Sequence, residues 1–216
     1  NDGRIDPIQL SKALLHRCIQ NHVQIINSKV VSLQRLESNT KWNWKIKLIN
    51  GETSVQHIVV ICGSTGTSSL LTQLGYSISI LPILGQALIL KVDKNELDLD
   101  QWPSAVMSYQ GFNLIPIQEN KLVIGATLEP GINPNRLELE KMKMLNGSAP
   151  QWIKNAEIVD QWHGIRGRPE GRGAPILEIL EKGLIVSSGH YRNGILLAPA
   201  SAEWVTNAIK KEISKG

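Results

Sequence analysis

The segment over residues 189–199 carries the residues best suited to hold a ligand: Gly-His-Tyr-Arg-Asn-Gly-Ile-Leu-Leu-Ala-Pro. It follows a short apolar run at residues 184–188 that is typical of a buried strand. It precedes an amphipathic stretch at residues 201–213 that is typical of a helix. A strand, a turn bounded by glycine and a helix start present free backbone N–H groups and the positive end of the helix dipole. The pattern therefore predicts a site for an anionic group.

A second stretch with possible chemistry is the run Arg-Gly-Arg-Pro-Glu-Gly-Arg-Gly at residues 166–173. Its glycines and proline predict a loop after a strand over residues 158–166. A guanidinium group binds a carboxylate through two parallel, charge-assisted hydrogen bonds, so an arginine of this run could hold the carboxylate of an amino acid. The alternative is that these arginines are solvated loop charges, and we favour that interpretation for Arg172.

The remaining residues form no recognisable metal or nucleic-acid site. Cys18 and Cys62 are the only cysteines, and we expect both to be small buried side chains rather than a disulfide or metal ligands. No metal-ligand spacing connects His16, His22, His57 and His163. The formal charge of +4 does not argue for nucleic acid. No apolar run reaches the roughly 20 residues of a membrane span. We therefore expect a cytoplasmic protein without metal, nucleic acid or membrane span.

The first part of the chain reads as a helix, several strands and a second short helix. Asp6 as a cap and Pro7 at the first position predict a helix start. Strands are predicted over residues 23–26, 29–36, 41–49 and 54–62, with Asn50-Gly51 as a tight turn before the last of them. Residues 68–74 predict a short helix that ends at Gly75.

From Ile78 the pattern changes to long apolar strands separated by polar turns. These strands are predicted over residues 84–92, 105–117 and 121–128, followed by a helix from 136 to about 145. The order of elements indicates a mixed α+β chain.

Several blocks resemble a known family in their order along the chain. The segment at residues 189–199 resembles the closing motif of the D-amino-acid-oxidase-like, FAD-dependent oxidoreductases, and most of all their glycine oxidase branch, which serves thiamine biosynthesis. The earlier blocks that resemble this family are Gly3-Arg4-Ile5-Asp6-Pro7, Val59-Val60-Ile61-Cys62-Gly63-Ser64-Thr65-Gly66, Leu81-Pro82-Ile83-Leu84-Gly85-Gln86, Leu122-Val123-Ile124-Gly125-Ala126-Thr127 and Trp162-His163-Gly164-Ile165-Arg166. Together they cover nearly the whole chain.

The resemblance implies a domain organisation. Residues 1–77 and 169–216 would form parts of an FAD-binding domain, and residues 78–168 an inserted antiparallel-sheet domain for the substrate. The family's opening Gly-x-Gly-x-x-Gly is missing, because the nearest run, Gly171-Arg172-Gly173, has Ile176 in place of the third glycine. We expect the chain to be the later part of a longer flavoprotein, and to bind FAD non-covalently and only weakly, or not at all, by itself.

The resemblance also implies roles for single residues. FAD would contact a set made of Val30, Gly63, Gly189, His190, Tyr191, Arg192, Asn193, Gly194, Ile195 and Leu196. Arg166 would bind the substrate carboxylate, and Arg192 would lie near both FAD and substrate. Asn113 stands where the family has a tyrosine of the substrate pocket. The family usually has proline directly after the carboxylate-binding arginine, whereas here Gly167 and Arg168 intervene, so Arg168 remains an alternative. No residue is expected to act as a catalytic acid or base.

The implied activity is the oxidation of glycine or another small amino acid or amine. Hydride would pass from the α-carbon to the flavin, water would hydrolyse the imine, and oxygen would be reduced to hydrogen peroxide. Two alternatives stay open: a flavin dehydrogenase of the same fold with another acceptor, and a non-catalytic binding or structural module. The sequence also leaves a homo-oligomer open.

Overall fold

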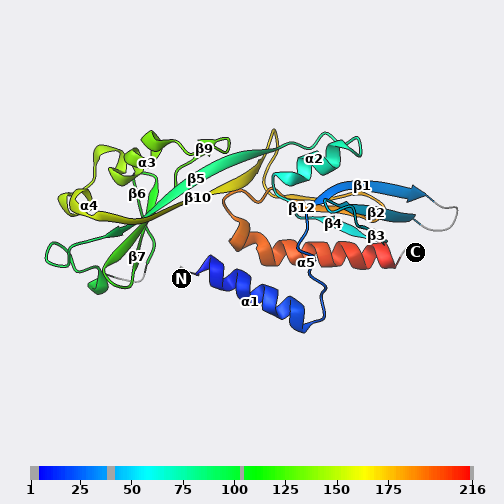
Figure 1. Cartoon of the computed structure of the whole chain (residues 1–216), viewed down its shortest axis with the longest axis horizontal. Helices are drawn as coiled ribbons and strands as arrows, with labels where there is room; N and C mark the ends of the chain where they lie inside the picture. Colours follow the sequence, from blue (N-terminus) through cyan, green and yellow to red (C-terminus); the bar gives the residue numbers. More distant parts are fainter. Residues whose placement is uncertain (1–4, 38–41, 103–104, 215–216) are drawn as a thin grey trace. The chain divides into compact units, whose positions relative to one another are not determined.

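The computed structural model describes residues 5–37, 42–102 and 105–214, and it confirms the predicted mixture of helices and sheets (Figure 1). The described chain divides into two compact units. One contains residues 5–10 and Pro82–Ile165, and we call it the six-stranded unit. The other contains Ser11–Leu81 and residues 166–214, and we call it the two-sheet unit. Whether these units serve flavin and substrate, with boundaries at 77/78 and 168/169, stays a prediction.

The six-stranded unit is built on one sheet. Its strands lie in the order β10-β5-β8-β7-β6, and β9 pairs with β5. Their bounds are β5 (Ile80–Lys91), β6 (Met107–Tyr109), β7 (Phe112–Ile117), β8 (Lys121–Gly125), β9 (Glu129–Pro130) and β10 (Glu157–Pro169). The pairs β5–β8, β8–β7 and β7–β6 are antiparallel.

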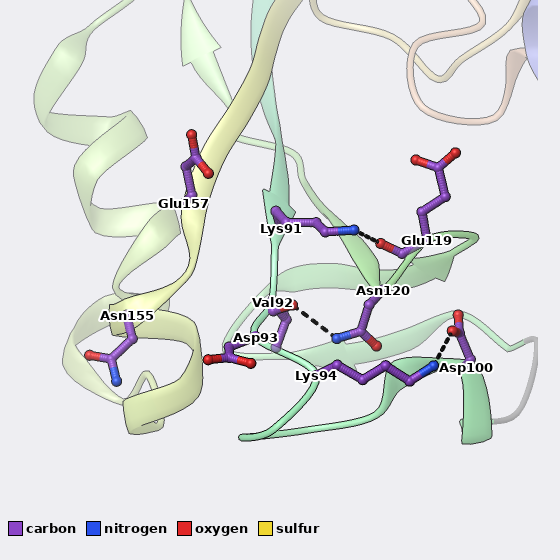
Figure 2. A pocket seen from close by; sticks show the side chains of 9 residues that line it. All are labelled: Lys91, Val92, Asp93, Lys94, Asp100, Glu119, Asn120, Asn155 and Glu157. Atoms are coloured by element: carbon purple, nitrogen blue, oxygen red, sulfur yellow. Dashed lines mark hydrogen bonds and ion pairs between the residues drawn. The ribbon is translucent and has the colours of Figure 1, made fainter.

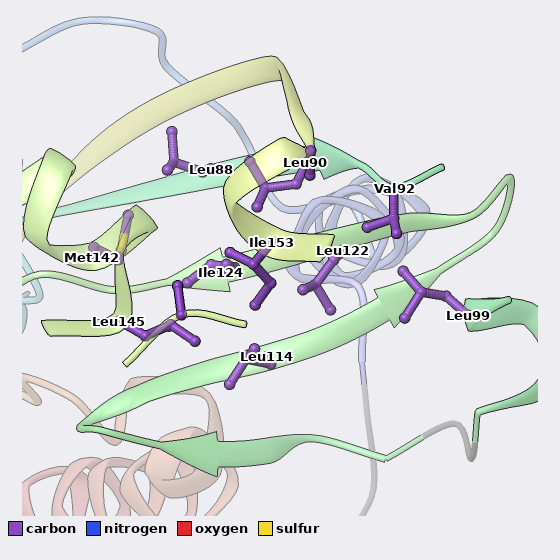
Figure 3. Close-up of a cluster of buried hydrophobic side chains, with 12 residues drawn as sticks. Leu88, Leu90, Val92, Leu99, Leu114, Leu122, Ile124, Met142, Leu145 and Ile153 are labelled. Carbon is purple, nitrogen blue, oxygen red and sulfur yellow. The ribbon is translucent and has the colours of Figure 1, made fainter. Parts of the chain in front are cut away.

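The core of this unit lies between the sheet and a group of short helices (Figure 3). The helical segments are η1 (Leu99–Gln101), α3 (Arg136–Lys143), η2 (Leu145–Gly147) and α4 (Gln151–Asn155). Alternate residues of β5 and β8 point to one face, as strand geometry requires. The buried side chains on the two sides of this core include Leu88, Leu90, Leu114, Leu122, Ile124, Met142, Leu145 and Ile153.

The two-sheet unit holds two three-stranded sheets. One is an antiparallel meander of β1 (Val30–Glu37), β2 (Trp42–Leu48) and β3 (Thr53–Gln56). The other has the order β11 (Ile176–Glu181), β12 (Leu184–Ser188), β4 (Val59–Ile61), in which β12 is antiparallel to β11 and parallel to β4. Helix α2 (Gly66–Thr72) follows β4, and α5 (Gly194–Ile213) follows β12 and contacts both β11 and β12. The shared core contains Leu33, Trp44, Ile61, Leu71, Ile80, Ile176, Leu184 and Val186.

Helix α1 (Pro7–Gln20) begins as predicted. The backbone N–H groups of Ile8 and Gln9 donate to the Asp6 carboxylate at 2.8 and 3.1 Å. This cap satisfies two of the donors at the helix start. None of the residues of α1 is buried. Among the described residues, no helix is both long and apolar enough to cross a membrane.

Several predicted strands differ from the structure. The run at 54–62 forms two strands in different sheets. β3 pairs with β2 and ends at Gln56, whereas β4 pairs with β12. The run at 105–117 is a hairpin, because Gln110 and Gly111 adopt positive φ and form a two-residue turn. Residues 23–26 form no strand and are largely exposed. The predicted strand start at residue 41 lies outside the described residues.

Other predictions were wrong near the ends of elements. Arg166–Pro169 belong to β10 rather than to a loop, and α5 begins at Gly194 rather than at Ser201. Pro199 lies in the second turn of α5, where its fixed φ is compatible with a helix although one backbone bond is lost. Cys18 and Cys62 are exposed rather than buried.

An ion pair joins the two sheets of the two-sheet unit. The Arg35 guanidinium on β1 binds the Glu181 carboxylate at the end of β11 through Nε at 2.6 Å and Nη2 at 2.5 Å. The Tyr76 hydroxyl also donates to Glu181, at 2.6 Å. The hydrogen bond from Arg35 holds the pKa of Glu181 below its ordinary value, although burial acts in the opposite direction. The fork is bidentate, which is the geometry in which such pairs stabilise a fold most.

Replacing Glu181 by glutamine is expected to lower the free energy of unfolding at neutral pH by about 1–2 kcal/mol, since both partners are partly exposed. The folded-state pKa of Glu181 is lowered, so its contribution is present above its unfolded pKa and is lost as pH falls through the folded value. Urea unfolding of the full-length protein at pH 7 and at acidic pH checks this. The control is Glu178→Gln, which removes the more exposed pair with Arg172. An equal loss at both pH values would contradict the prediction.

Candidate functional site

The site starts at the carboxyl ends of two neighbouring parallel strands. Val186 of β12 lies beside Ile61 of β4, so the loops that follow the two strands leave the same edge of the sheet. The hydroxyls of Thr67 and Ser188 share a buried hydrogen bond of 2.8 Å, which fixes the start of α2 against the end of β12. Ligands of α/β sheets bind at such an edge, because loops and helix starts converge there.

The loop between β12 and α5 is sharply folded. Gly189 and Tyr191 both have positive φ, at 66° and 55°. The N–H of Asn193 donates to the carbonyl of His190 at 3.2 Å. The His190 ring shares a hydrogen bond of 2.9 Å with the buried Ser201 hydroxyl of α5. Burial lowers the pKa of His190, so its ring is neutral at pH 7.

Helix α5 starts at this loop with donors available. Asn193 is the residue before the helix, and its side chain makes no capping hydrogen bond. The first N–H groups of a helix have no acceptor within the helix, so those of Gly194 and Ile195 face outward from its positive end. Leu196 is 78% exposed. The packing of α5 on β11 and β12 places the helix, and with it the helix start.

The end of β10 packs against both loops. A Cβ on Gly167 would lie 2.6 Å from the Ser64 hydroxyl oxygen and 2.8 Å from a methyl carbon of Ile80. A Cβ on Gly189 would lie 2.8 Å from Cγ of Pro169. Only glycine permits this approach, so the β10 end, the β4–α2 loop and the β12–α5 loop are in direct contact.

The two arginines of this strand lie on its other face. Successive side chains of a strand point to opposite sides, so Arg166 and Arg168 face away from the buried Gly167 and Pro169. The Arg168 guanidinium lies 5.9 Å from the centre of the Tyr191 ring. Burial lowers the pKa of Arg166; of two smaller influences, that of Tyr191 raises it and that of Arg192 lowers it further. Arginine stays charged nonetheless. Arg168 thus lies against the Tyr191 ring, and Arg166 lies within electrostatic range of Tyr191 and Arg192.

Of the other predicted site residues, Gly63 lies in the β4–α2 loop beside this site, whereas Val30 and Asn113 lie on other strands. Val30 starts β1, and its side chain packs on the core of the two-sheet unit. Gly63 lies in the exposed β4–α2 loop, where its carbonyl accepts from the N–H of Gly66 at 2.9 Å. Asn113 lies on β7 of the six-stranded unit, where its side-chain oxygen accepts from the Ser108 hydroxyl at 2.8 Å. Ser64 was not predicted from the sequence as a contact, since only the folded structure places it against Gly167.

The six-stranded unit also has a polar hollow of about 520 Å³ (Figure 2). Both lysines that line it already have partners in the protein. Lys91 donates to the backbone carbonyl of Glu119, and Lys94 pairs with Asp100 at 3.1 Å. Asn120 is held by the carbonyls of Val92 and Leu97, each at 2.9 Å. These groups stabilise the hairpin and leave no converging set of free donors. Within the described ranges, no cluster of His, Cys, Asp and Glu could hold a metal ion.

Comparison with known proteins gives consistent matches. The profile of the family "FAD dependent oxidoreductase" matches residues 1–208. The chain is 28% identical over 223 residues to glycine oxidase of Geobacillus kaustophilus, covering 98% of this chain and 55% of that protein. It is 31% identical over 157 residues to glycine oxidase of Pseudomonas putida, covering 70% of this chain and 41% of that protein. The crystal structure of the Geobacillus glycine oxidase superposes with a TM-score of 0.69 at 26% identity, over 85% of this chain and 48% of that one. The chain thus spans about half the length of the curated relatives it matches.

Proposed function

Because the chain belongs to the family of FAD-dependent oxidoreductases, we propose that the protein it forms oxidises glycine or another small amino acid. The resemblance read from the motifs is confirmed by this membership, which also implies FAD as the cofactor. The substrate and the whole reaction are proposals, as are a cytoplasmic location and any homo-oligomeric assembly.

The loop and helix start after β12 fit one flank of the flavin. Backbone donors at the start of α5 suit the edge of a ring that gains negative charge when it is reduced. In this proposal the flavin is held non-covalently by residues 189–196, with Gly63 in the neighbouring loop and the backbone of Val30 as further contacts. The sharp loop between Gly189 and Asn193 lets the backbone approach the ligand closely.

The task of the protein side chains is to bind and orient the substrate. When bound, FAD would accept the two electrons of the bond between the substrate α-carbon and its hydrogen. Arg166 binds the carboxylate with its planar fork and thereby fixes the α-carbon. Arg192 adds positive charge beside it, and Asn113 contributes an amide to the substrate pocket. The His190 ring is hydrogen-bonded to the buried Ser201 hydroxyl, so we assign it the task of positioning the loop.

One observation carries this proposal above the others. The half-buried Arg166 lies within electrostatic range of Tyr191 and Arg192, beside the start of the helix that the family motif marks. A guanidinium group at this place suits the carboxylate of an amino acid substrate, which it can bind through two parallel hydrogen bonds.

Two measurements on the full-length protein test the function. Glycine added without oxygen should bleach the absorbance of bound flavin, and admission of air should then release hydrogen peroxide. Bleaching without peroxide would replace the oxidase by a dehydrogenase with another acceptor. A protein that holds flavin but is bleached by no amine would refute the proposed amine oxidation.

The 216-residue chain alone is expected to purify without stoichiometric yellow colour. Its sequence contains no Gly-x-Gly-x-x-Gly to hold the pyrophosphate of FAD, so only one flank of the site remains. Absorbance at the flavin band after incubation with FAD and gel filtration checks this, with the full-length protein as the control. Stoichiometric flavin on the isolated chain would contradict the prediction.

A further inference from the structure

We infer that the preferred substrate carries a second anionic group, as in a dicarboxylic amino or imino acid, and that Arg168 binds this group. The inference rests on the proposed function and specifies its substrate class.

The position of Arg168 supports this role. It lies two residues after Arg166 on the same face of β10, which separates the two Cα atoms by about 6.6 Å. Its guanidinium lies 5.9 Å from the centre of the Tyr191 ring, a contact that directs it toward the β12–α5 loop. Gly167, between the two arginines, and Pro169, directly after Arg168, pack against the neighbouring loops and hold the strand in place. The two arginines therefore project from the same face of β10.

Arg168 is the arginine near Tyr191 to which the proposed function gives no other task. In the proposed function Arg166 takes the α-carboxylate, and Arg192 is shared with the flavin, which leaves Arg168. In the described part of the chain, neither Arg168 nor Arg192 forms an ion pair with a carboxylate. Arg172, four residues further on, is paired with Glu178. A second carboxylate on the substrate would give the Arg168 guanidinium an anionic partner.

The sequence agrees with a special role for this arginine. Gly167 and Arg168 intervene before Pro169, whereas the family pattern has proline directly after the carboxylate-binding arginine. Glycine at 167 is required by the contact with Ser64, so β10 keeps its packing there. The departure from the family pattern therefore adds a cation, Arg168, two residues after Arg166.

The test compares substrates on the full-length protein. We expect kcat/KM for iminodiacetate or an enantiomer of aspartate to exceed that for glycine by about tenfold or more, as the gain of a charge-assisted hydrogen-bond pair allows. In Arg168→Gln this preference ratio should fall by about 10- to 100-fold. Arg168→Lys should retain part of it, because the ammonium keeps the charge without the fork. The control Arg172→Gln should leave the ratio unchanged.

A binding measurement gives a second readout. Malonate should raise the Tm of the full-length protein more than acetate at equal concentration and ionic strength, and Arg168→Gln should abolish the difference. Equal shifts by the two anions, together with a preference ratio that Arg168→Gln leaves unchanged, would overturn the inference while amine oxidation stands. If no amine bleaches the flavin, the proposed function itself fails and the inference falls with it.

Discussion

Replacing Arg166 by alanine in the full-length protein is expected to lower kcat/KM for glycine by about two orders of magnitude or more. The substitution removes two charge-assisted hydrogen bonds of about 1.5–3 kcal/mol each and frees the α-carbon from its position. The half-buried setting of Arg166 strengthens these bonds, because water competes less there. Steady-state kinetics with glycine, normalised to flavin content, measures the effect.

Three comparisons make this result specific. Arg166→Lys should recover only part of the activity, since an ammonium cannot reproduce the planar fork. Flavin content should stay normal in both variants, because none of the proposed flavin contacts lies on β10. Arg168→Ala provides the matched comparison from the same face of β10. If Arg168→Ala loses activity toward glycine and Arg166→Ala does not, Arg168 is the residue that binds the α-carboxylate.

The largest structural effect is expected at Gly183, in the turn between β11 and β12. Its φ is +71°, and a Cβ there would lie 2.3 Å from the carbonyl oxygen of His57 and 3.1 Å from the Trp44 ring nitrogen. Both neighbours are fixed, the first as backbone and the second as a fully buried side chain. Gly183→Ala is therefore expected to lower the free energy of unfolding by about 3 kcal/mol or more. Urea unfolding of the full-length protein measures this loss.

Gly51→Ala is the matched control for this experiment. Gly51 also has positive φ, at +90°, but a Cβ there would meet nothing within 4 Å. The control therefore carries only the conformational cost, about 1 kcal/mol. Similar losses in both variants would show that the contact with His57 yields easily and would contradict the expected clash.

The sequence predicted the elements whose signals are local. The cap at Asp6, the turn at Asn50-Gly51 and the short helix before Gly75 depend on neighbouring residues, and each is found close to its predicted place. The break between β3 and β4 could not be read in this way. Only the polar pair Gln56-His57 marks it, and the two strands belong to different sheets because β12, more than 120 residues later, pairs with β4. The turn at Gln110-Gly111 had a local signal, the glycine, that was missed.

The candidate site shows the same limit. Its motif residues were found by resemblance, and their roles remain predictions. The contacts of Gly167 with Ser64, and of Arg168 with Tyr191, join segments that lie far apart in the sequence. No periodicity or composition encodes such contacts, since they depend on how two loops meet the end of β10.

The alternation along the end of β10 has a practical consequence for altering this protein. Gly167 and Pro169 pack against the neighbouring loops, whereas the proposals assign substrate recognition to Arg166 and Arg168, so the two demands would fall on separate positions of one strand end. A library randomised at position 168 alone would sample new substrate preferences while every member keeps the same junction of loops. Evolution can use the same freedom, because a change of substrate at position 168 would require no compensating substitution at the packing residues.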